Sequence, residues 1–176
     1  MIPSGAPEVP LPNETPGAHA RRLAEDKARH VASAHAGAAA AVVLGADTVV
    51  TALGRILGKP TDEAEAKAML RFLSGKTHEV LTGVFLIRTD NGQSTGSVTT
   101  TRVRFRPLSD ALIDWYLATG EPADKAGAYS IQDRGVLLSE QIEGSWSNVV
   151  GLPLEALPDM FARVSMNIFT HLPQQP

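Results

Sequence analysis

Asp47 is the residue whose sequence surroundings most clearly point to chemistry. It lies inside an apolar run, residues 41–50, with the sequence AVVLGADTVV. A carboxylate buried in such a run is costly unless a partner, a metal ion or water compensates it. If the run ends as a central strand near Asp47, the carboxylate reaches the crevice in which α/β sheets bind ligands. The alternative is a structural aspartate that caps a turn, and composition alone does not distinguish the two.

Two lysines are candidates for holding an anionic ligand. Lys59 stands between Gly58 and Pro60, which restrict the backbone around it. Lys27 falls on a predicted helix among several arginines. Each has an ordinary alternative, because a lone lysine or a basic helix face is usually just solvated. Glu8 follows a proline in an irregular segment and carries no signal by itself.

The segment 124–132, with the sequence DKAGAYSIQ, is the densest group of candidate binding residues. Its small residues allow close backbone approach, and Tyr129 offers a face for stacking. Gln132 offers both a hydrogen-bond donor and an acceptor, so its amide could read a base edge that also presents one of each. The alternative is a tight turn ahead of a strand.

The elements that must position these residues mix helices and strands throughout. Thr15 and Pro16 form a helix start, and this helix fades near Gly37. Residues 41–50 are predicted as a strand covered on both faces. The other predicted elements are a helix between Asp62 and Gly75, strands at 77–90, 97–106 and 136–142, a helix over 109–120, and a last helix that starts near Pro153. This order predicts an α/β or α+β fold with a central mixed sheet flanked by helices.

Composition excludes several classes of function. The 176 residues fit a single domain, 1–176, with a loose tail over 171–176. The absence of cysteine rules out disulfides and thiolate chemistry. A formal charge of −3 without a Lys/Arg run argues against nucleic-acid binding. No membrane-spanning run of about 18 apolar residues and no signal peptide is present, so a cytoplasmic setting is expected.

An ordered series of motifs resembles the Maf family, which is named for septum-formation inhibition and is similar to the inosine-triphosphate pyrophosphatase fold. The series consists of Arg22-Leu23-Ala24 with Lys27-Ala28, residues 44–50, Gly58-Lys59-Pro60, Met69-Leu70 to Leu73-Ser74-Gly75, His78-Glu79-Val80 with Thr82-Gly83, Gly120-Glu121-Pro122, residues 124–132, and Val150-Gly151-Leu152-Pro153. One such fragment is weak, but the whole series in order is highly specific. The sequence contains no phosphate-binding P-loop, dinucleotide-binding glycine motif or nucleophile elbow.

The resemblance implies hydrolysis of a nucleoside triphosphate between its α and β phosphates, which yields the monophosphate and pyrophosphate. It implies that Asp47 is the proton acceptor and helps to hold a divalent cation, Mg²⁺ or Mn²⁺. Lys27 and Lys59 match the family's phosphate-site lysines, and Glu8 matches an acidic residue of the metal site. This chemistry is coherent, because phosphoryl transfer needs charge neutralisation and a placed nucleophile more than covalent help.

The pair Thr48 and Gln132 resembles the branch of the family that acts on dTTP and UTP. Uracil and thymine expose a carbonyl acceptor beside an N–H donor, which one side-chain amide can match. The implied partner is therefore a nucleoside triphosphate, with neither nucleic acid nor a membrane, and the family suggests a homodimer.

The beginning of the sequence departs from the family pattern. Family members begin with a short hydrophobic strand and a loop of the type Ser-x-Ser-Pro-Arg-Arg, which grips phosphates, whereas this sequence starts just ahead of Glu8. We therefore expect a domain truncated at its N-terminus relative to the family, through a late start assignment or degeneration, with weak activity and marginal stability. The alternative function is a catalytically impaired nucleotide-binding or division-regulating protein, and a third is an unrelated α/β domain.

Overall fold

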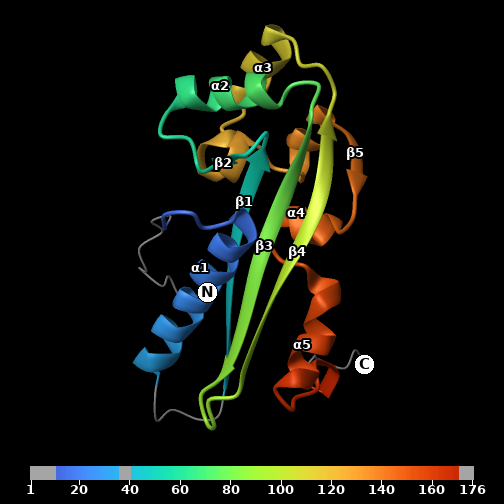
Figure 1. Cartoon of the computed structure of the whole chain (residues 1–176). Coiled ribbons are helices and arrows are strands. Elements are labelled where there is room, and N and C mark those ends of the chain that lie inside the picture. Colours follow the sequence, from blue (N-terminus) through green and yellow to red (C-terminus); the bar gives the residue numbers. More distant parts are fainter. Residues whose placement is uncertain (1–10, 36–40, 171–176) are drawn as a thin grey trace. The chain divides into compact units, whose positions relative to one another are not determined.

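A computed structural model describes residues 11–35 and 41–170 (Figure 1). Its centre is a five-stranded sheet in the order β2-β1-β3-β4-β5. The strands are β1 (Val42–Ala52), β2 (Arg55–Leu57), β3 (Thr77–Arg88), β4 (Ser94–Phe105) and β5 (Ser139–Glu143). The strand β2 is antiparallel to β1, and β5 is antiparallel to β4. The protein thus has a mixed α/β fold with helices flanking a central sheet, which confirms the predicted class.

Of the helices, the first three begin where the sequence predicts caps, and the fourth was not predicted. They are α1 (Pro16–Ala34), α2 (Glu63–Leu73), α3 (Asp110–Leu117), α4 (Trp146–Val150) and α5 (Leu157–Arg163), with 3₁₀ turns at Glu121–Asp124, Ala126–Ala128, Asp133–Leu138, Leu154–Ala156 and Ile168–Thr170. The Thr15 hydroxyl accepts from the amide of Ala18 at 3.2 Å. At α2, Asp62 accepts from the amide of Glu65 at 2.8 Å, while the Glu65 carboxylate accepts from Thr61 N at 2.7 Å. This arrangement is a capping box shifted by one residue.

Several predicted boundaries were wrong. The strand predicted at 136–142 is a 3₁₀ turn followed by β5, and β4 begins at Ser94 instead of residue 97. The last helix starts at Leu157 after a separate turn. The short strand β2 was not predicted. It forms because Leu53 and Gly54 both have positive φ, 49° and 76°, which is the geometry of a tight two-residue hairpin turn.

The chain divides into two compact units. The first contains residues 1–47, 82–98 and 152–176, and the second contains residues 48–81 and 99–151. The division passes through β1 between Asp47 and Thr48. The expectation of a single domain over 1–176 stays a prediction, and the tail at 171–176 and the expected fading of the first helix near Gly37 lie outside the described residues.

The core of the first unit depends on close contact between α1 and two strands. A Cβ added at Gly45 would lie 2.1 Å from the carbonyl oxygen of Ala24, and one at Gly83 would lie 2.3 Å from that of Ala20. Such distances are far below van der Waals contact, so only glycine permits this approach. Val84 and Leu86 of β3 also belong to this unit, and they pack with Leu157 and Met160 of α5 in a separate apolar cluster.

The second unit has the larger apolar core. Its fully buried side chains include Leu70 and Leu73 of α2, Ile113 and Tyr116 of α3, and Phe105 of β4. Within the described residues, no helix has both the length and the apolar character needed to cross a membrane.

Candidate functional site

The predicted catalytic carboxylate is paired with a predicted phosphate-site lysine. Lys27 Nζ of α1 donates to Asp47 Oδ1 of β1 at 2.7 Å. The side chain of Asp47 is 9% exposed and that of Lys27 is 21% exposed. A charge-assisted hydrogen bond of this length orients both groups. The compensation that the sequence demanded for a carboxylate in an apolar run is therefore supplied, at least in part, by Lys27.

The packing of α1 on β1 explains how this pair forms. Gly45 and Asp47 are two residues apart on a strand and share one face of it. The absence of a side chain at Gly45 lets the backbone of Ala24 and Ala28 approach closely. Lys27 follows Ala24 by three residues, roughly one helical turn, which brings its side chain to the same region of the strand. A glycine inside a predicted strand was the available signal for this approach.

Asp47 does not lie at the end of its strand. The strand β1 continues for five residues beyond it, to Ala52. The condition under which Asp47 would reach a crevice at a strand end is therefore not met, and Asp47 lies inside the strand. The extension to Ala52 follows from the hairpin with β2, in which Val50 pairs with Leu57 and Ala52 with Arg55.

A second group of charges fixes the start of α1. Glu14 Oε1 accepts from Arg22 Nε at 2.7 Å, and Glu14 Oε2 accepts from an Arg22 amino group at 2.9 Å. His19 Nδ1 lies 2.9 Å from the same carboxylate. The hydrogen bonds from Arg22 hold the pKa of Glu14 at about 2, well below its usual value. The motif residue Arg22 thus orders the segment ahead of α1, while the neighbouring Leu23 is buried.

Of the two predicted metal ligands, Asp47 lies within the described residues. Glu8, the second predicted metal ligand, lies outside the described residues. Within residues 11–35 and 41–170 there is no cluster of three or more His, Asp or Glu side chains that could hold an ion. Asp47 nevertheless offers the hard oxygen ligand that Mg²⁺ prefers, and Mg²⁺ is commonly bound by one or two carboxylates together with substrate phosphates. The residues present therefore fit a cation that is held jointly by Asp47 and a bound triphosphate.

In the second unit, Lys59 lies on an exposed loop between β2 and α2. The carbonyl of the preceding Gly58 accepts from the amide of Gly127 at 3.0 Å. Gly127 has a positive φ of 71°, and a Cβ there would lie 3.1–3.3 Å from the side chain of Val50. The small residues of segment 124–132 thus allow close backbone approach, as predicted. They connect the loop that carries Lys59 to the segment that carries Gln132.

Gln132 is exposed, at the tip of a turn that follows Tyr129. Its backbone amide donates to the Ser130 hydroxyl at 3.1 Å, and the next residue, Asp133, has a positive φ of 51°. Thr48 is partly buried on β1, and a Cβ added at Gly151 would lie 3.6 Å from its hydroxyl oxygen. Thr48, Lys59 and Gln132 therefore all belong to the second unit, on three separate segments, whereas Lys27 and Asp47 belong to the first.

Tyr129 does not present the stacking face that the sequence suggested. Its side chain is buried, and its hydroxyl shares a hydrogen bond with His78 Nε2 at 2.8 Å. The rings of His78, Phe105 and Tyr129 make mutual edge-to-face contacts, with centroids 4.7–5.3 Å apart. Burial lowers the pKa of His78 to about 4 and raises that of the Tyr129 hydroxyl. This neutral aromatic cluster supports the segment ahead of Gln132 from inside the core.

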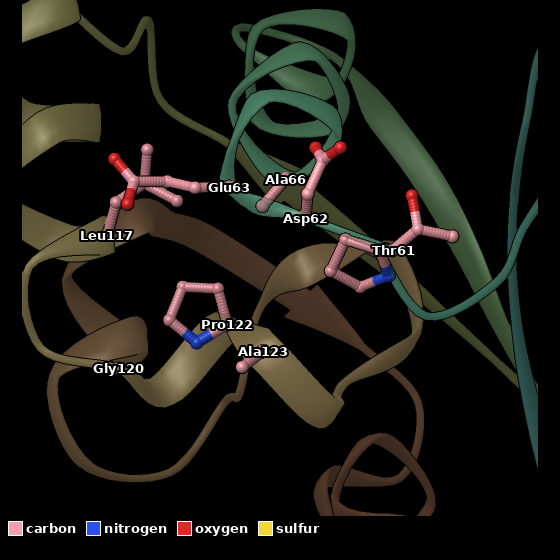
Figure 2. A pocket seen from close by; sticks show the side chains of 9 residues that line it. Thr61, Asp62, Glu63, Ala66, Leu117, Gly120, Pro122 and Ala123 are labelled. Atoms are coloured by element: carbon pink, nitrogen blue, oxygen red, sulfur yellow. The ribbon is translucent and has the colours of Figure 1, made fainter.

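A cavity of about 240 Å³ lies in the second unit, between the start of α2 and the segment around Pro122 (Figure 2). Its lining includes Asp62, Glu63, Leu117 and Ala123. None of the predicted site residues contributes to this lining, although Pro60, which follows Lys59, does. The cavity is therefore not the site that the sequence predicts.

Sequence reasoning did not single out Glu121 or Tyr116 as functional residues. Glu121 accepts from the amide of Gly135 at 3.2 Å, and the Tyr116 hydroxyl accepts from that of Ser130 at 3.0 Å. Both contacts hold the turn that carries Gln132. Glu121 was noted only as part of a family motif, and Tyr116 only as an apolar helix position.

Comparison with known proteins gives a consistent result. The family model described as Maf-like protein matches residues 1–164. A dTTP/UTP pyrophosphatase of Symbiobacterium thermophilum is 49% identical over 157 residues, which are 89% of this chain and 78% of the relative. The dTTP/UTP pyrophosphatase of Moorella thermoacetica is 49% identical over 154 residues, 88% of this chain and 78% of the relative. That of Geobacter sulfurreducens is 48% identical over 158 residues, 89% of this chain and 81% of the relative.

Proposed function

The chain belongs to the family of Maf-like proteins, and we propose that it is a nucleoside-triphosphate pyrophosphatase that acts on dTTP and UTP. The reaction cleaves the α–β anhydride bond and releases the nucleoside monophosphate and pyrophosphate. The similarity to relatives that bear this name supports the activity. The single structural observation that carries it is the hydrogen bond between Lys27 and Asp47, which places a carboxylate base and a cation side by side on adjacent elements.

Asp47 acts as the proton acceptor in this proposal. A water molecule attacks phosphorus, the bond to the bridging oxygen breaks, and pyrophosphate leaves as the water proton passes to the carboxylate. General-base assistance requires a base that is held in one orientation within reach of the water. The 2.7 Å hydrogen bond from Lys27 supports this role, because it fixes one carboxylate oxygen of a largely buried group.

The two lysines neutralise charge on the phosphates. Hydrolysis of a phosphoanhydride depends chiefly on positioning and on stabilising negative charge. Lys27 is partly exposed beside Asp47, and Lys59 is exposed on a loop whose backbone is tied down at Gly58. We assign both to the phosphate chain of the substrate.

A divalent cation, Mg²⁺ or Mn²⁺, is assigned to Asp47, with Glu8 as a second ligand and the substrate phosphates completing the set. When bound, the ion supplies charge neutralisation at the phosphates. The protein residues orient the base and hold the lysines, and these roles do not depend on the exact coordination of the ion.

Base selection is assigned to Gln132 and Thr48. The exposed amide of Gln132 can donate to a pyrimidine carbonyl and accept from the adjacent N–H. A glutamate at this position could accept but not donate. Thr48 directly follows the proposed base on β1, so its hydroxyl belongs to the same stretch of chain as the reaction centre. We place the activity in the cytoplasm, and a homodimer stays a prediction that sedimentation analysis would test.

Product analysis tests the proposed reaction. The full chain is incubated with UTP, dTTP, CTP or GTP and with Mg²⁺ or Mn²⁺, and the products are separated by anion-exchange chromatography. Monophosphate and pyrophosphate in equal amounts, fastest from UTP and dTTP, are expected. Diphosphate with orthophosphate would contradict cleavage at the α–β bond. Tight binding of a non-hydrolysable UTP analogue without any turnover would instead identify a nucleotide-binding protein.

A further inference from the structure

The turn that carries Gln132 is closed by contacts between its two ends. A Cβ added at Gly135 would lie 1.8 Å from the Ser130 carbonyl oxygen and 2.8 Å from the Tyr116 hydroxyl oxygen. Only a glycine can therefore occupy this position without moving the chain. The turn from Ser130 to Gly135 is a compact loop with Gln132 near its tip, and its shape depends on what holds the ends together.

Glu121 holds the far end of this loop. Its carboxylate oxygens accept from two successive backbone amides, those of Arg134 at 3.4 Å and Gly135 at 3.2 Å. The side chain of Glu121 is only 16% exposed, so it is largely committed to these contacts. The Arg134 guanidinium lies 3.6 Å from the same carboxylate. Successive amides that converge on one carboxylate form a small anion-binding concavity within the chain.

Tyr116 holds the near end. It is fully buried, and its hydroxyl accepts from the amide of Ser130 at 3.0 Å. Burial, with a contribution from the negative charge of Glu121, raises the pKa of Tyr116 to about 12, so the phenol stays protonated. The two ends of the loop are thus tied to side chains from α3 and from the turn that follows it.

We propose that Glu121 is a positioning residue for base recognition, which fixes the loop 130–135 so that the Gln132 amide meets the pyrimidine edge in a single orientation. The inference rests on the proposed function, because Gln132 must read the base for its orientation to matter. An exposed amide on a loose loop would have to be ordered by the substrate, at the expense of affinity. A loop that is already ordered avoids that loss.

The substitution Glu121→Gln removes a hydrogen-bond acceptor and keeps the size of the side chain. Glutamine keeps the size of the side chain, but it has one acceptor oxygen, and its NH₂ group would face an amide that also donates. One of the two loop contacts is therefore lost. The matched control is Glu140→Gln, the same change of charge at an exposed residue of β5 that forms an ion pair with Arg104 of β4. Tyr116→Phe, which removes the acceptor for Ser130, is the second variant.

The measurement is the ratio of kcat/KM for UTP to kcat/KM for GTP in the full chain. We expect Glu121→Gln and Tyr116→Phe to lower the ratio about tenfold, mainly through KM for UTP, because roughly one neutral hydrogen bond to the base is lost. The control should leave it unchanged. Faster amide exchange at residues 130–136, measured by mass spectrometry, should accompany the loss in both variants.

A double-mutant cycle decides whether Glu121 acts through Gln132. In a Gln132→Ala background, Glu121→Gln should change the ratio no further. A further fall of similar size in the double variant would overturn the proposal. The proposal would also be overturned if Gln132→Ala alone lowers the ratio and Glu121→Gln alone leaves it unchanged. If neither Gln132→Ala nor Glu121→Gln changes the ratio while UMP and pyrophosphate still form, two claims fail together: that Gln132 reads the base, and that Glu121 positions it. The proposed reaction would then still stand.

Discussion

The two compact units hold their functional side chains by different means. In the first unit the contacts are ionic. Lys27 pairs with Asp47 at 2.7 Å, and Arg22 donates two hydrogen bonds to the Glu14 carboxylate. In the second, buried neutral hydrogen bonds stand beside the Glu121 carboxylate, which accepts from the backbone amides of Arg134 and Gly135. There the ring of His78 shares a hydrogen bond with a tyrosine hydroxyl, and the buried Asn148 amide donates to the Val80 carbonyl at 3.0 Å.

This contrast matches two different chemical tasks. Phosphates and a transferred proton require charges, which must be paired when the substrate is absent. A pyrimidine edge requires a donor and an acceptor held in a fixed geometry, which hydrogen bonds to the surrounding chain can supply. The residues proposed for proton transfer, Asp47 and Lys27, belong to the first unit, and the residues proposed for base selection, Thr48 and Gln132, belong to the second, as does Lys59.

The largest expected effect is that of Asp47→Asn. The amide keeps the shape of the side chain but removes the base, so kcat for UTP should fall by at least about 10²-fold. The affinity for a non-hydrolysable UTP analogue, measured by calorimetry, should change much less. Asp159→Asn, an exposed position on α5, is the matched control. Unchanged turnover in Asp47→Asn would return this residue to a structural role.

A smaller loss of activity is expected for Lys27→Gln. Each charge-assisted hydrogen bond contributes about 1.5–3 kcal/mol, so removal of this ammonium should lower kcat/KM by roughly 10- to 150-fold. Both kcat and KM should change, because Lys27 is assigned to binding of the phosphates and to the orientation of Asp47. Arg29→Gln alters an exposed pair with Glu25 on the same helix and serves as control. If the two variants lose the same activity, the effect of Lys27 is that of helix charge alone.

Gln132→Glu should alter selectivity more than rate. The change removes the donor and places a negative charge against a pyrimidine carbonyl, so the ratio of kcat/KM for UTP to that for GTP should fall about 10- to 100-fold. The stability of the second unit should not change, because the side chain is exposed. Kinetics with both substrates and a thermal melt test this together. A constant ratio would show that Gln132 does not read the base.

A further effect is expected on stability at mild acidity. The pKa of His78 is about 4 in the folded protein, against about 6.5 when unfolded. Between these values the unfolded chain binds more protons, so the free energy of unfolding should fall as the pH drops from 6.5 to 4, by at most about 1.4 kcal/mol per pH unit. In His78→Gln this slope should flatten, as measured by urea unfolding. A slope identical to that of the unsubstituted chain would contradict a neutral buried His78.

The first unit should respond in a different pH window. Glu14 has a folded pKa of about 2 against a reference of 4.5. Its contribution is therefore complete above pH 4.5 and disappears as the pH falls toward 2. In Glu14→Gln, the loss of stability between pH 4.5 and 2 should be reduced while the slope between 6.5 and 4 remains. Urea unfolding of both variants over the full range thus separates the two kinds of network.

The sequence predicted what depends on local patterns. Caps at Thr15 and Asp62 and the apolar run around Asp47 are visible within a few residues, and the ordered motifs identify the family. What it could not predict depends on contacts between distant segments. Whether β1 ends at Asp47 is decided by a hairpin with a strand of only three residues, and of the two turn residues only Gly54 is of a type that commonly adopts positive φ.

The site follows the same rule. Asp47 and Lys27 could be proposed from residue type and motif, but their 2.7 Å contact depends on the close packing that Gly45 allows. Tyr129 is polar and aromatic in the sequence, which favours an exposed stacking role, yet a partner 51 residues away holds it in the core. The role of Glu121 becomes visible only in the structure, where its carboxylate accepts from two backbone amides that lie 13 and 14 residues further along the chain.

The central claim is that this chain cleaves the α–β bond of UTP with Asp47 as the base. The most direct test follows UTP with Mg²⁺ by ³¹P NMR, with the unsubstituted chain and Asp47→Asn side by side. We predict that the β- and γ-phosphate signals of UTP convert together into the single signal of pyrophosphate as UMP appears, and that Asp47→Asn slows this conversion by at least about 10²-fold. The appearance of UDP and orthophosphate, or equal rates for the two proteins, would contradict it.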